Sequence, residues 1–141
     1  MKFNLNEIRL KSVSKLDYDF LYDLLKQRKT NMNISHKKMP TLKQHEKFIS
    51  SKPYKKWFIL KLQNESIGSI YLSFQNEIGF FLKHGYDIDE IRSYALNLFF
   101  EKTNQSQYFV NINPKNKKSI RFFQNNGFTL LQKTYKLEIN N

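Results

Sequence analysis

The stretch NPKNKKSIRFFQNNGF, residues 113–128, carries the marks of a short helix with a defined start and end. Asn113 or Asn116 can cap its first turn, because an Asn side-chain oxygen accepts hydrogen bonds from backbone N–H groups that have no partner within the helix. Pro114 lies at the entrance, where a missing N–H costs nothing. The pattern predicts a helix over residues 116–125.

The exit of this stretch is as well defined as its entrance. Gly127 suits the left-handed residue that commonly ends a helix, and Phe128 is then expected to fold back on the last turn. Ile120 and Phe123 lie on one face of the predicted helix, which we expect to cover a sheet.

Periodicity elsewhere in the chain predicts an α/β protein with a mixed sheet. The expected order is β-α-α-β-β-β-α-β-α-β-β, and because the sequence shows no linker, repeat or low-complexity tract, we expect a single domain over residues 1–141. The predicted strands are 7–13, 57–62, 66–74, 77–82, 108–112, 128–131 and 134–139, and the predicted helices are 17–28, 42–52, 88–102 and 116–125.

The helices carry start signals and apolar stripes. Asp17 can cap the first helix, and Thr41 with Gln44 forms a capping box before the second. We expect three sets of residues to face inward. They are Phe20, Leu21, Leu24 and Leu25 in the first helix, Leu42, His45, Phe48 and Ile49 in the second, and Ile91, Ala95, Leu98 and Phe99 in the third.

Composition excludes several classes of site. The chain has 141 residues, 40% of them hydrophobic, which is typical of a globular protein, and it contains no Cys. There is therefore no disulfide framework, no thiolate nucleophile and no Cys-based zinc site. His36, His45 and His84 show no ligand spacing, so no metal is expected. No apolar run has the length needed to cross a membrane, and we expect a cytoplasmic protein.

The net charge of +12 has two interpretations. It suits an acidic partner, such as a phosphorylated cofactor, a nucleotide-linked substrate or a nucleic acid, but it also suits a solvated basic surface rich in Lys. Nucleic acid is not expected to be a partner, because Arg, the residue best suited to phosphate and base contacts, is scarce. A homodimer is left open.

The order of elements and two motif regions resemble the GNAT acetyltransferase superfamily over essentially the whole chain. The first region is the stretch at 113–128, with its Asn, small residue, aromatic residue and Gly-Phe exit. The second is NEIGFFLKHGYDIDEIRSYALNLFF, residues 76–100, which is similar to the family's fourth strand and cofactor helix. The resemblance implies a sheet that splays between its fourth and fifth strands, and a cleft there for acetyl-coenzyme A (acetyl-CoA).

The resemblance also implies which residues bind this cofactor. Backbone groups of the fourth strand would pair with the pantetheine arm, and N–H groups at the start of the next helix would face the pyrophosphate. In this sequence these positions are Phe80, Phe81 and Leu82 in the strand, Glu90, Ile91, Arg92 and Ser93 in the helix, and Asn116, Ser119 and Phe123 in the later helix.

The pyrophosphate loop departs from the family pattern Arg/Gln-x-x-Gly-x-Gly/Ala. Its positions hold Asp87, Glu90 and Arg92, so two glycines that allow close backbone approach are missing. The acids suit a helix N-terminus, where Asp87 makes a good cap, but they repel a pyrophosphate. Arg92 and Lys83 are the residues that would compensate.

The catalytic groups implied by the resemblance are only partly present. Glu77 matches the family's general base on the fourth strand, although it also suits an exposed strand end. The Tyr that protonates the leaving thiolate in many members is replaced by Phe123, which cannot donate a proton. Tyr94 and Tyr135 are the alternative acids.

The resemblance extends to the branch that acetylates amino groups of nucleotide-linked sugars. It implies a substrate site with Arg28, Asn31 and His45, although the apolar stripe around His45 also suits a core histidine. Two functions follow from the sequence. One is an N-acetyltransferase that acts on the primary amine of a small acceptor such as an amino sugar. The other is a non-catalytic binding or regulatory domain with an eroded pyrophosphate loop.

Overall fold

The structure is a computed structural model that describes residues 4–31 and 39–140, without the side chains of 29–31. It consists of two compact units, Met1–Asn111 and Ile112–Asn141, which are described separately. Within the described residues, no helix is long and apolar enough to span a membrane.

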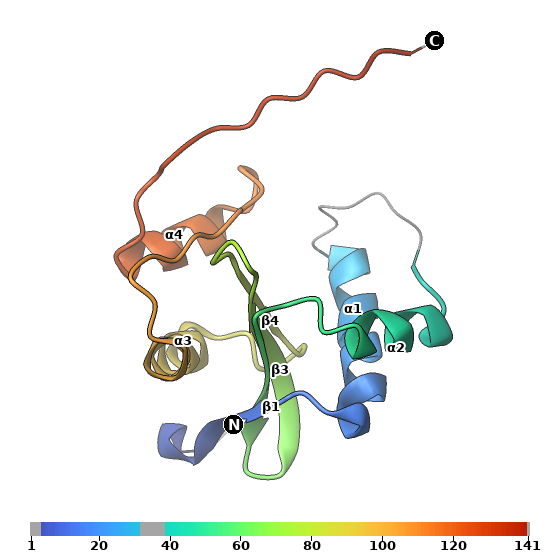
Figure 1. The fold of residues 1–141 in the computed structure, drawn as a ribbon. Coiled ribbons are helices and arrows are strands. Elements are labelled where there is room, and N and C mark those ends of the chain that lie inside the picture. Colours follow the sequence, from blue (N-terminus) through green and yellow to red (C-terminus); the bar gives the residue numbers. More distant parts are fainter. Residues whose placement is uncertain (1–3, 32–38, 141) are drawn as a thin grey trace. The chain divides into compact units, whose positions relative to one another are not determined.

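The first unit is built on a four-stranded antiparallel sheet with the order β1-β2-β3-β4 (Figure 1). Its strands are β1 (Ile8–Ser12), β2 (Lys56–Leu62), β3 (Glu65–Leu72) and β4 (Ile78–Leu82), and its helices are α1 (Tyr18–Asn31), α2 (Leu42–Ser50) and α3 (Asp89–Thr103), with short 3₁₀ turns η1 (Leu5–Glu7) and η2 (Lys15–Asp17). Each of these strands and helices confirms a predicted element to within a few residues.

The sheet lies between two helical layers, with α3 on one face and α1 with α2 on the other (Figure 1). Neighbouring residues of β2 show this division, because successive side chains of a strand point to opposite faces. Phe58 makes an edge-to-face contact with Phe99 of α3, with ring centroids 6.2 Å apart. Ile59 packs with Leu21 of α1 and Ile49 of α2.

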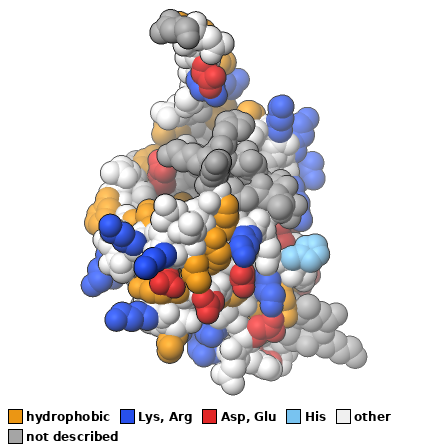
Figure 2. Space-filling view, turned by 90° about the vertical axis from the view of Figure 1, so that its right-hand side faces the viewer, with side chains coloured by type: hydrophobic (Ala, Val, Ile, Leu, Met, Phe, Trp, Pro, Cys, Tyr) orange, Lys and Arg blue, Asp and Glu red, His pale blue; other side chains and the backbone are white. Residues whose placement is uncertain are grey.

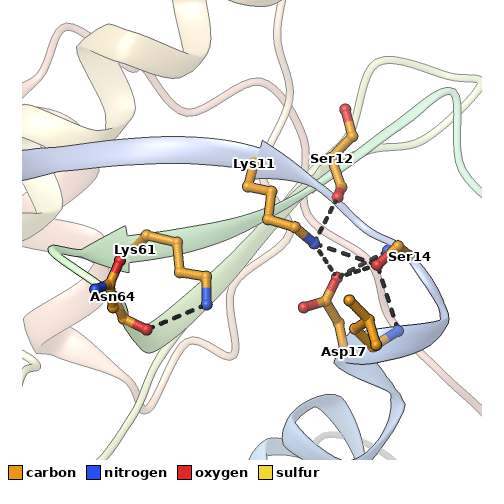
Figure 3. Close-up of polar contacts among 7 residues, drawn as sticks. Lys11, Ser12, Ser14, Asp17, Lys61 and Asn64 are labelled. Carbon is orange, nitrogen blue, oxygen red and sulfur yellow. Dashed lines mark hydrogen bonds and ion pairs between the residues drawn. The ribbon is translucent and has the colours of Figure 1, made fainter.

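The entrance to α1 differs from the prediction, because Asp17 is not its cap. Asp17 ends η2, and its buried carboxylate accepts a hydrogen bond from the Ser14 backbone N–H at 2.8 Å. Lys11 of β1 donates to the same carboxylate at 2.7 Å, which ties the strand to the helix (Figure 3). The same figure shows Lys61 closing the β2–β3 turn on the carbonyl of Asn64.

The capping box of α2 is confirmed, but its apolar stripe is narrower than predicted. Thr41 and Gln44 exchange side-chain and backbone hydrogen bonds at 3.1 and 2.9 Å. His45 and Ile49, one helical turn apart, are buried. The prediction that Leu42 and Phe48 also face inward is wrong, since both are exposed.

The start of α3 also differs from the prediction. Ile88 occupies the N-cap position and makes no side-chain cap. Asp87, expected to cap the helix, instead pairs with Arg92 at 3.0 Å. The predicted stripe is confirmed for Ile91, Ala95 and Phe99. Leu98, which was also predicted to face inward, is only half-buried, and Leu96 is fully buried instead.

Three predicted strands do not form. Residues 108–112 make only a single parallel bridge, between Phe109 and Glu77, and residues 128–131 and 134–139 belong to no strand. The large apolar residues of this last segment are 72–86% exposed; they are Leu130, Leu131, Tyr135, Leu137 and Ile139. Alternating sequence favours an extended backbone, but a strand also needs a partner backbone, which the described residues do not give to this segment.

The second unit confirms the helix of the opening stretch as α4 (Lys117–Asn125). Asn116 is its N-cap and accepts a hydrogen bond from the Ser119 N–H at 3.3 Å. Gly127 has the predicted positive φ of 93°, and the N–H of Phe128 returns to the carbonyl of Phe123 at 3.0 Å. The ring centroids of Phe123 and Phe128 lie 5.2 Å apart, and the two rings meet edge to face.

Candidate active site

The outer edge of β4 offers backbone groups that the sheet does not use. Lys83 donates to the carbonyl of Ile67, and Ser73 donates to that of Glu77, so the odd-numbered residues of β4 pair with β3. The N–H and C=O groups of Ile78, Phe80 and Leu82 therefore point to the opposite edge.

Only the first part of this edge has a partner among the described residues of the first unit. The N–H of Ile78 donates to the carbonyl of Phe109 at 2.8 Å, and Phe109 donates to Asn76 at 2.9 Å. Beyond that bridge, the ladder of β4 runs only to β3. The strand predicted at 108–112, from which the fourth strand was expected to splay, does not form. The pairing ends at this bridge, and the outward backbone groups of Phe80 and Leu82 have no partner among the described residues of the first unit.

The two faces of β4 carry different environments. Phe80 lies on the α3 side, where the Arg92 guanidinium is 5.6 Å from its ring centroid. Phe81 lies on the other face, together with Gly79 and Glu77 by the alternation of the strand. A Cβ atom at Gly79 would overlap the ring of Tyr71 on β3, so a larger residue at this position would have to displace that ring.

Glu77, the predicted general base, lies at the start of β4. Its backbone is held by Ser73, whose hydroxyl accepts from the Glu77 N–H at 2.9 Å and whose own N–H donates to the Glu77 carbonyl at 2.9 Å. The residue is exposed. Its position fits a base open to solvent, and its catalytic role remains a prediction.

The start of α3 places the predicted pyrophosphate contacts differently from expectation. The Arg92 N–H donates to Ile88 within the helix, and the Arg92 guanidinium is buried against Asp87. By helix geometry, the N–H groups without an intrahelical acceptor at this end belong to Asp89, Glu90 and Ile91. The N–H groups of Arg92 and Ser93 lie inside the helix and are not available to a pyrophosphate.

Nearby basic and polar groups at this end are already engaged. Lys83 and Tyr86 both bond the carboxylate of Glu65 at 3.0 Å. These hydrogen bonds lower the pKa of Glu65, Lys83 contributing most. Asp89 and Glu90 stay exposed at the helix end.

On the α1 side, the guanidinium of Arg28 sits on the face of the Phe81 ring, 3.5 Å from its centroid. Tyr54 stacks on Tyr71 with centroids 3.7 Å apart and planes 1° apart, and Trp57 packs edge-on against Tyr54 at 4.8 Å. We call these five residues the Arg28 cluster. Burial lowers the pKa of Arg28, and the two tyrosines oppose that shift.

Burial also raises the pKa of Tyr54 well above its ordinary value, with a smaller contribution from Tyr71. Its hydroxyl therefore stays protonated. Trp57 is fixed in this cluster by its indole N–H, which donates to Ser69 at 2.8 Å. Figure 2 shows the side of the molecule on which α1 and α2 lie, where basic and acidic side chains are interspersed with hydrophobic ones.

His45 of α2 lies beside this cluster, as the predicted substrate site requires. Burial lowers its pKa, and the charge of Arg28 adds to that effect. Its ring is tilted against Tyr22, with centroids 5.6 Å apart. Its Nδ1 is buried without a hydrogen-bond partner among the described residues, so His45 is a neutral, largely buried imidazole with an unused polar atom.

The lowered pKa of His45 predicts a loss of stability in weak acid. The unfolded chain takes up a proton near the ordinary histidine pKa, whereas the folded protein resists it, so stability should fall as pH drops from 7 to 5. In His45→Gln this part of the pH dependence should disappear. Urea unfolding at several pH values measures it, with His84→Gln, a change at an exposed histidine, as the control. Equal slopes for His45→Gln and wild type would contradict the expectation.

Other predicted site residues do not belong to the described side chains of the first unit. Asn31 is the last residue of α1, and its side chain lies outside the described part. Asn116, Ser119 and Phe123 belong to the second unit, as does Tyr135, which is 86% exposed. Among the described residues, no group of His, Cys, Asp or Glu side chains could hold a metal ion.

Sequence reasoning missed Tyr54, Tyr71 and Gly79. Their arrangement depends on the register that pairs Tyr71 with Gly79 across β3 and β4. The glycine in the otherwise bulky run IGFFL was the one signal of a close approach to this strand.

Solved structures of acetyltransferases superpose on this chain. An acetyltransferase from Thermus thermophilus superposes with a TM-score of 0.73 at 18% identity, covering 89% of this chain and 88% of that one. The ribosomal L7/L12 alpha-N-protein acetyltransferase RimL, solved with coenzyme A, gives 0.71 at 16% identity, covering 89% and 81%. The chain has the GNAT acetyltransferase fold.

A third neighbour is the microcin C7 self-immunity acetyltransferase MccE, in complex with acetyl-CoA and AMP. It superposes with a TM-score of 0.71 at 22% identity and covers 95% of this chain and 85% of that one. No protein-family model and no curated protein sequence matches the chain. These likenesses establish the fold.

Proposed function

We propose that this protein is an N-acetyltransferase that moves an acetyl group from acetyl-CoA to the primary amine of a small acceptor. The observation that carries the proposal is the outer edge of β4, which is open beyond Ile78 among the described residues of the first unit, in a chain with this fold. An edge strand with unpaired N–H and C=O groups binds an extended chain of amides, such as a pantetheine arm, by backbone hydrogen bonds.

The fit of the cofactor differs along its length. Phe80 and Leu82 present alternate backbone groups to the pantetheine arm, and this part fits. The start of α3 has free N–H groups but also the exposed acids Asp89 and Glu90, so this part suits a pyrophosphate poorly. When bound, acetyl-CoA supplies the thioester whose carbonyl the acceptor amine attacks.

The residues of this chain then have separate tasks. Glu77 takes the proton that the acceptor ammonium must lose before its nitrogen can attack. Phe123 cannot protonate the leaving thiolate, and Tyr94 of α3 is the candidate for that step in the first unit. Arg28 and His45 bind the acceptor, for which an amino sugar linked to a nucleotide is the specific proposal.

A proline at position 82 tests the role of the open edge. The Leu82 N–H points away from β3, so Leu82→Pro removes a donor that the sheet does not use and should leave the protein folded. If this N–H bonds the pantetheine arm, acetyl-CoA affinity should fall about 3–10-fold, the effect of one neutral hydrogen bond. Isothermal titration calorimetry measures the affinity, and circular dichroism checks the fold.

Leu82→Ala is the matched control for this experiment, because it shortens the side chain but keeps the N–H. It should bind acetyl-CoA nearly as well as wild type. Equal affinities for the proline and alanine variants would contradict a role for this edge in cofactor binding.

A non-catalytic binding domain is the second candidate function. The observation in its favour is the start of α3, where no glycine stands between Asp87 and Arg92 and two acids are exposed. Absence of acetyl-CoA binding by wild type at millimolar concentration would favour this candidate over the enzyme.

A further inference from the structure

Arg28 is a half-buried cation without an acidic partner among the described residues. Its guanidinium stacks on Phe81, and the groups that act on its charge are the hydroxyls of Tyr54 and Tyr71. Arg92, on the other face of β4, differs because Asp87 pairs with it at 3.0 Å. Among the described residues, no hydrogen bond is made by the planar set of donors of this desolvated guanidinium.

Two further polar groups lie near this cation. The Tyr54 hydroxyl is hydrogen-bonded to Tyr71, whereas the buried Nδ1 of His45 has no partner among the described residues. The charge of Arg28 acts on both residues, which places them near the guanidinium. A buried polar atom without a partner is costly, so a ligand that satisfies it gains affinity.

We propose that the Arg28 cluster binds an acidic group of the acceptor, a carboxylate or a phosphate, with the guanidinium as its main contact. Both groups accept two parallel hydrogen bonds from a guanidinium, and such charged pairs are stronger than neutral ones. His45 supplies a further polar contact, and the aromatic rings shield the site from water.

The cluster and Glu77 lie on the same face of β4, so one acceptor can reach both. Phe81 is four residues beyond Glu77, which is about 13 Å along a strand. The acceptor is therefore an amine whose acidic group lies several bonds away, as in an amino sugar phosphate or a short peptide. The position of the acceptor amine beside Glu77 rests on the proposed function, whereas binding of the acidic group of the acceptor by the Arg28 cluster does not.

Pairs of acceptors that differ only in the acidic group test the proposal. Glucosamine 6-phosphate is compared with glucosamine, and glycylglycine with its C-terminal amide, so the pairs separate phosphate from carboxylate. We expect kcat/KM to be about 10–100-fold higher for the acidic member of at least one pair, the effect of a charged hydrogen bond. Arg28→Gln should abolish this preference for the acidic member, and Arg28→Lys should restore part of it.

Thermal shift with the same four probes, without acetyl-CoA, separates this proposal from the proposed function. The preferred acidic probe should raise the Tm of wild type but not that of Arg28→Gln, even if no acetyl transfer occurs. Arg9→Gln, which removes an exposed arginine on β1, is the matched control and should behave as wild type. Equal shifts by acidic and neutral probes, or an acidic preference that survives in Arg28→Gln, would overturn the proposal.

Discussion

Glu77→Gln is expected to lower kcat about 10²–10⁴-fold, the usual contribution of a positioned general base. The acceptor amine is protonated near neutral pH, and the amide of Gln cannot take up its proton. The fold should be unaffected, because the hydrogen bonds that hold residue 77 come from its backbone. Initial rates of coenzyme A release from acetyl-CoA in the presence of an acceptor measure the effect.

The pH profile distinguishes loss of a base from a general loss of activity. Without Glu77, only acceptor that is already deprotonated reacts, so the residual rate of the variant should rise steeply with pH. Glu101→Gln, at an exposed position of α3, is the control and should keep the wild-type rate. A Glu77→Gln enzyme with wild-type kcat would show that Glu77 is only an exposed residue at the end of the strand and not the general base.

Phe99→Ala is expected to reduce the free energy of unfolding by about 3–5 kcal/mol. Phe99 is fully buried on α3 and contacts Phe58 of β2, so the substitution removes a large apolar side chain and leaves a cavity between helix and sheet. Because a domain of this size has a total stability of roughly 5–15 kcal/mol, the variant would retain only a part of the free energy of unfolding of the wild type.

Urea unfolding followed by circular dichroism measures this change. Phe74→Ala is the matched control, because the same atoms are removed at a position that is 61% exposed, and it should change stability by less than about 0.5 kcal/mol. A similar loss for both variants would show that the α3–sheet interface is not the main core.

The elements predicted from sequence are those that local signals define. The Thr41–Gln44 capping box, the Asn116 cap and the Gly127 exit each depend on residues a few positions apart, and the structure confirms all three. Asp17 and Asp87 have the same local chemistry but form other bonds, since Lys11 and Arg92 come within reach of their carboxylates only in the folded chain.

The candidate site shows the same division. Phe80, Phe81 and Leu82 could be selected from the motif, and their placement on β4 agrees with the expectation. The open edge itself follows from the pairing that joins Phe109 to the start of this strand and no further. The Arg92 N–H was predicted to face the pyrophosphate, but Arg92 is the fourth residue of α3 and its N–H bonds the carbonyl of Ile88 within the helix.

The sequence by itself determined the order of helices and strands from β1 to α3 and the short helix α4. Hydrophobic period, caps and glycines act over one or two turns of chain, so they are readable without a structure. Only the tertiary structure placed Arg28 on Phe81, stacked Tyr54 on Tyr71 over Gly79, and left residues 128–140 without a strand partner among the described residues. These features depend on contacts between residues far apart in the chain, and no local pattern encodes which surfaces meet.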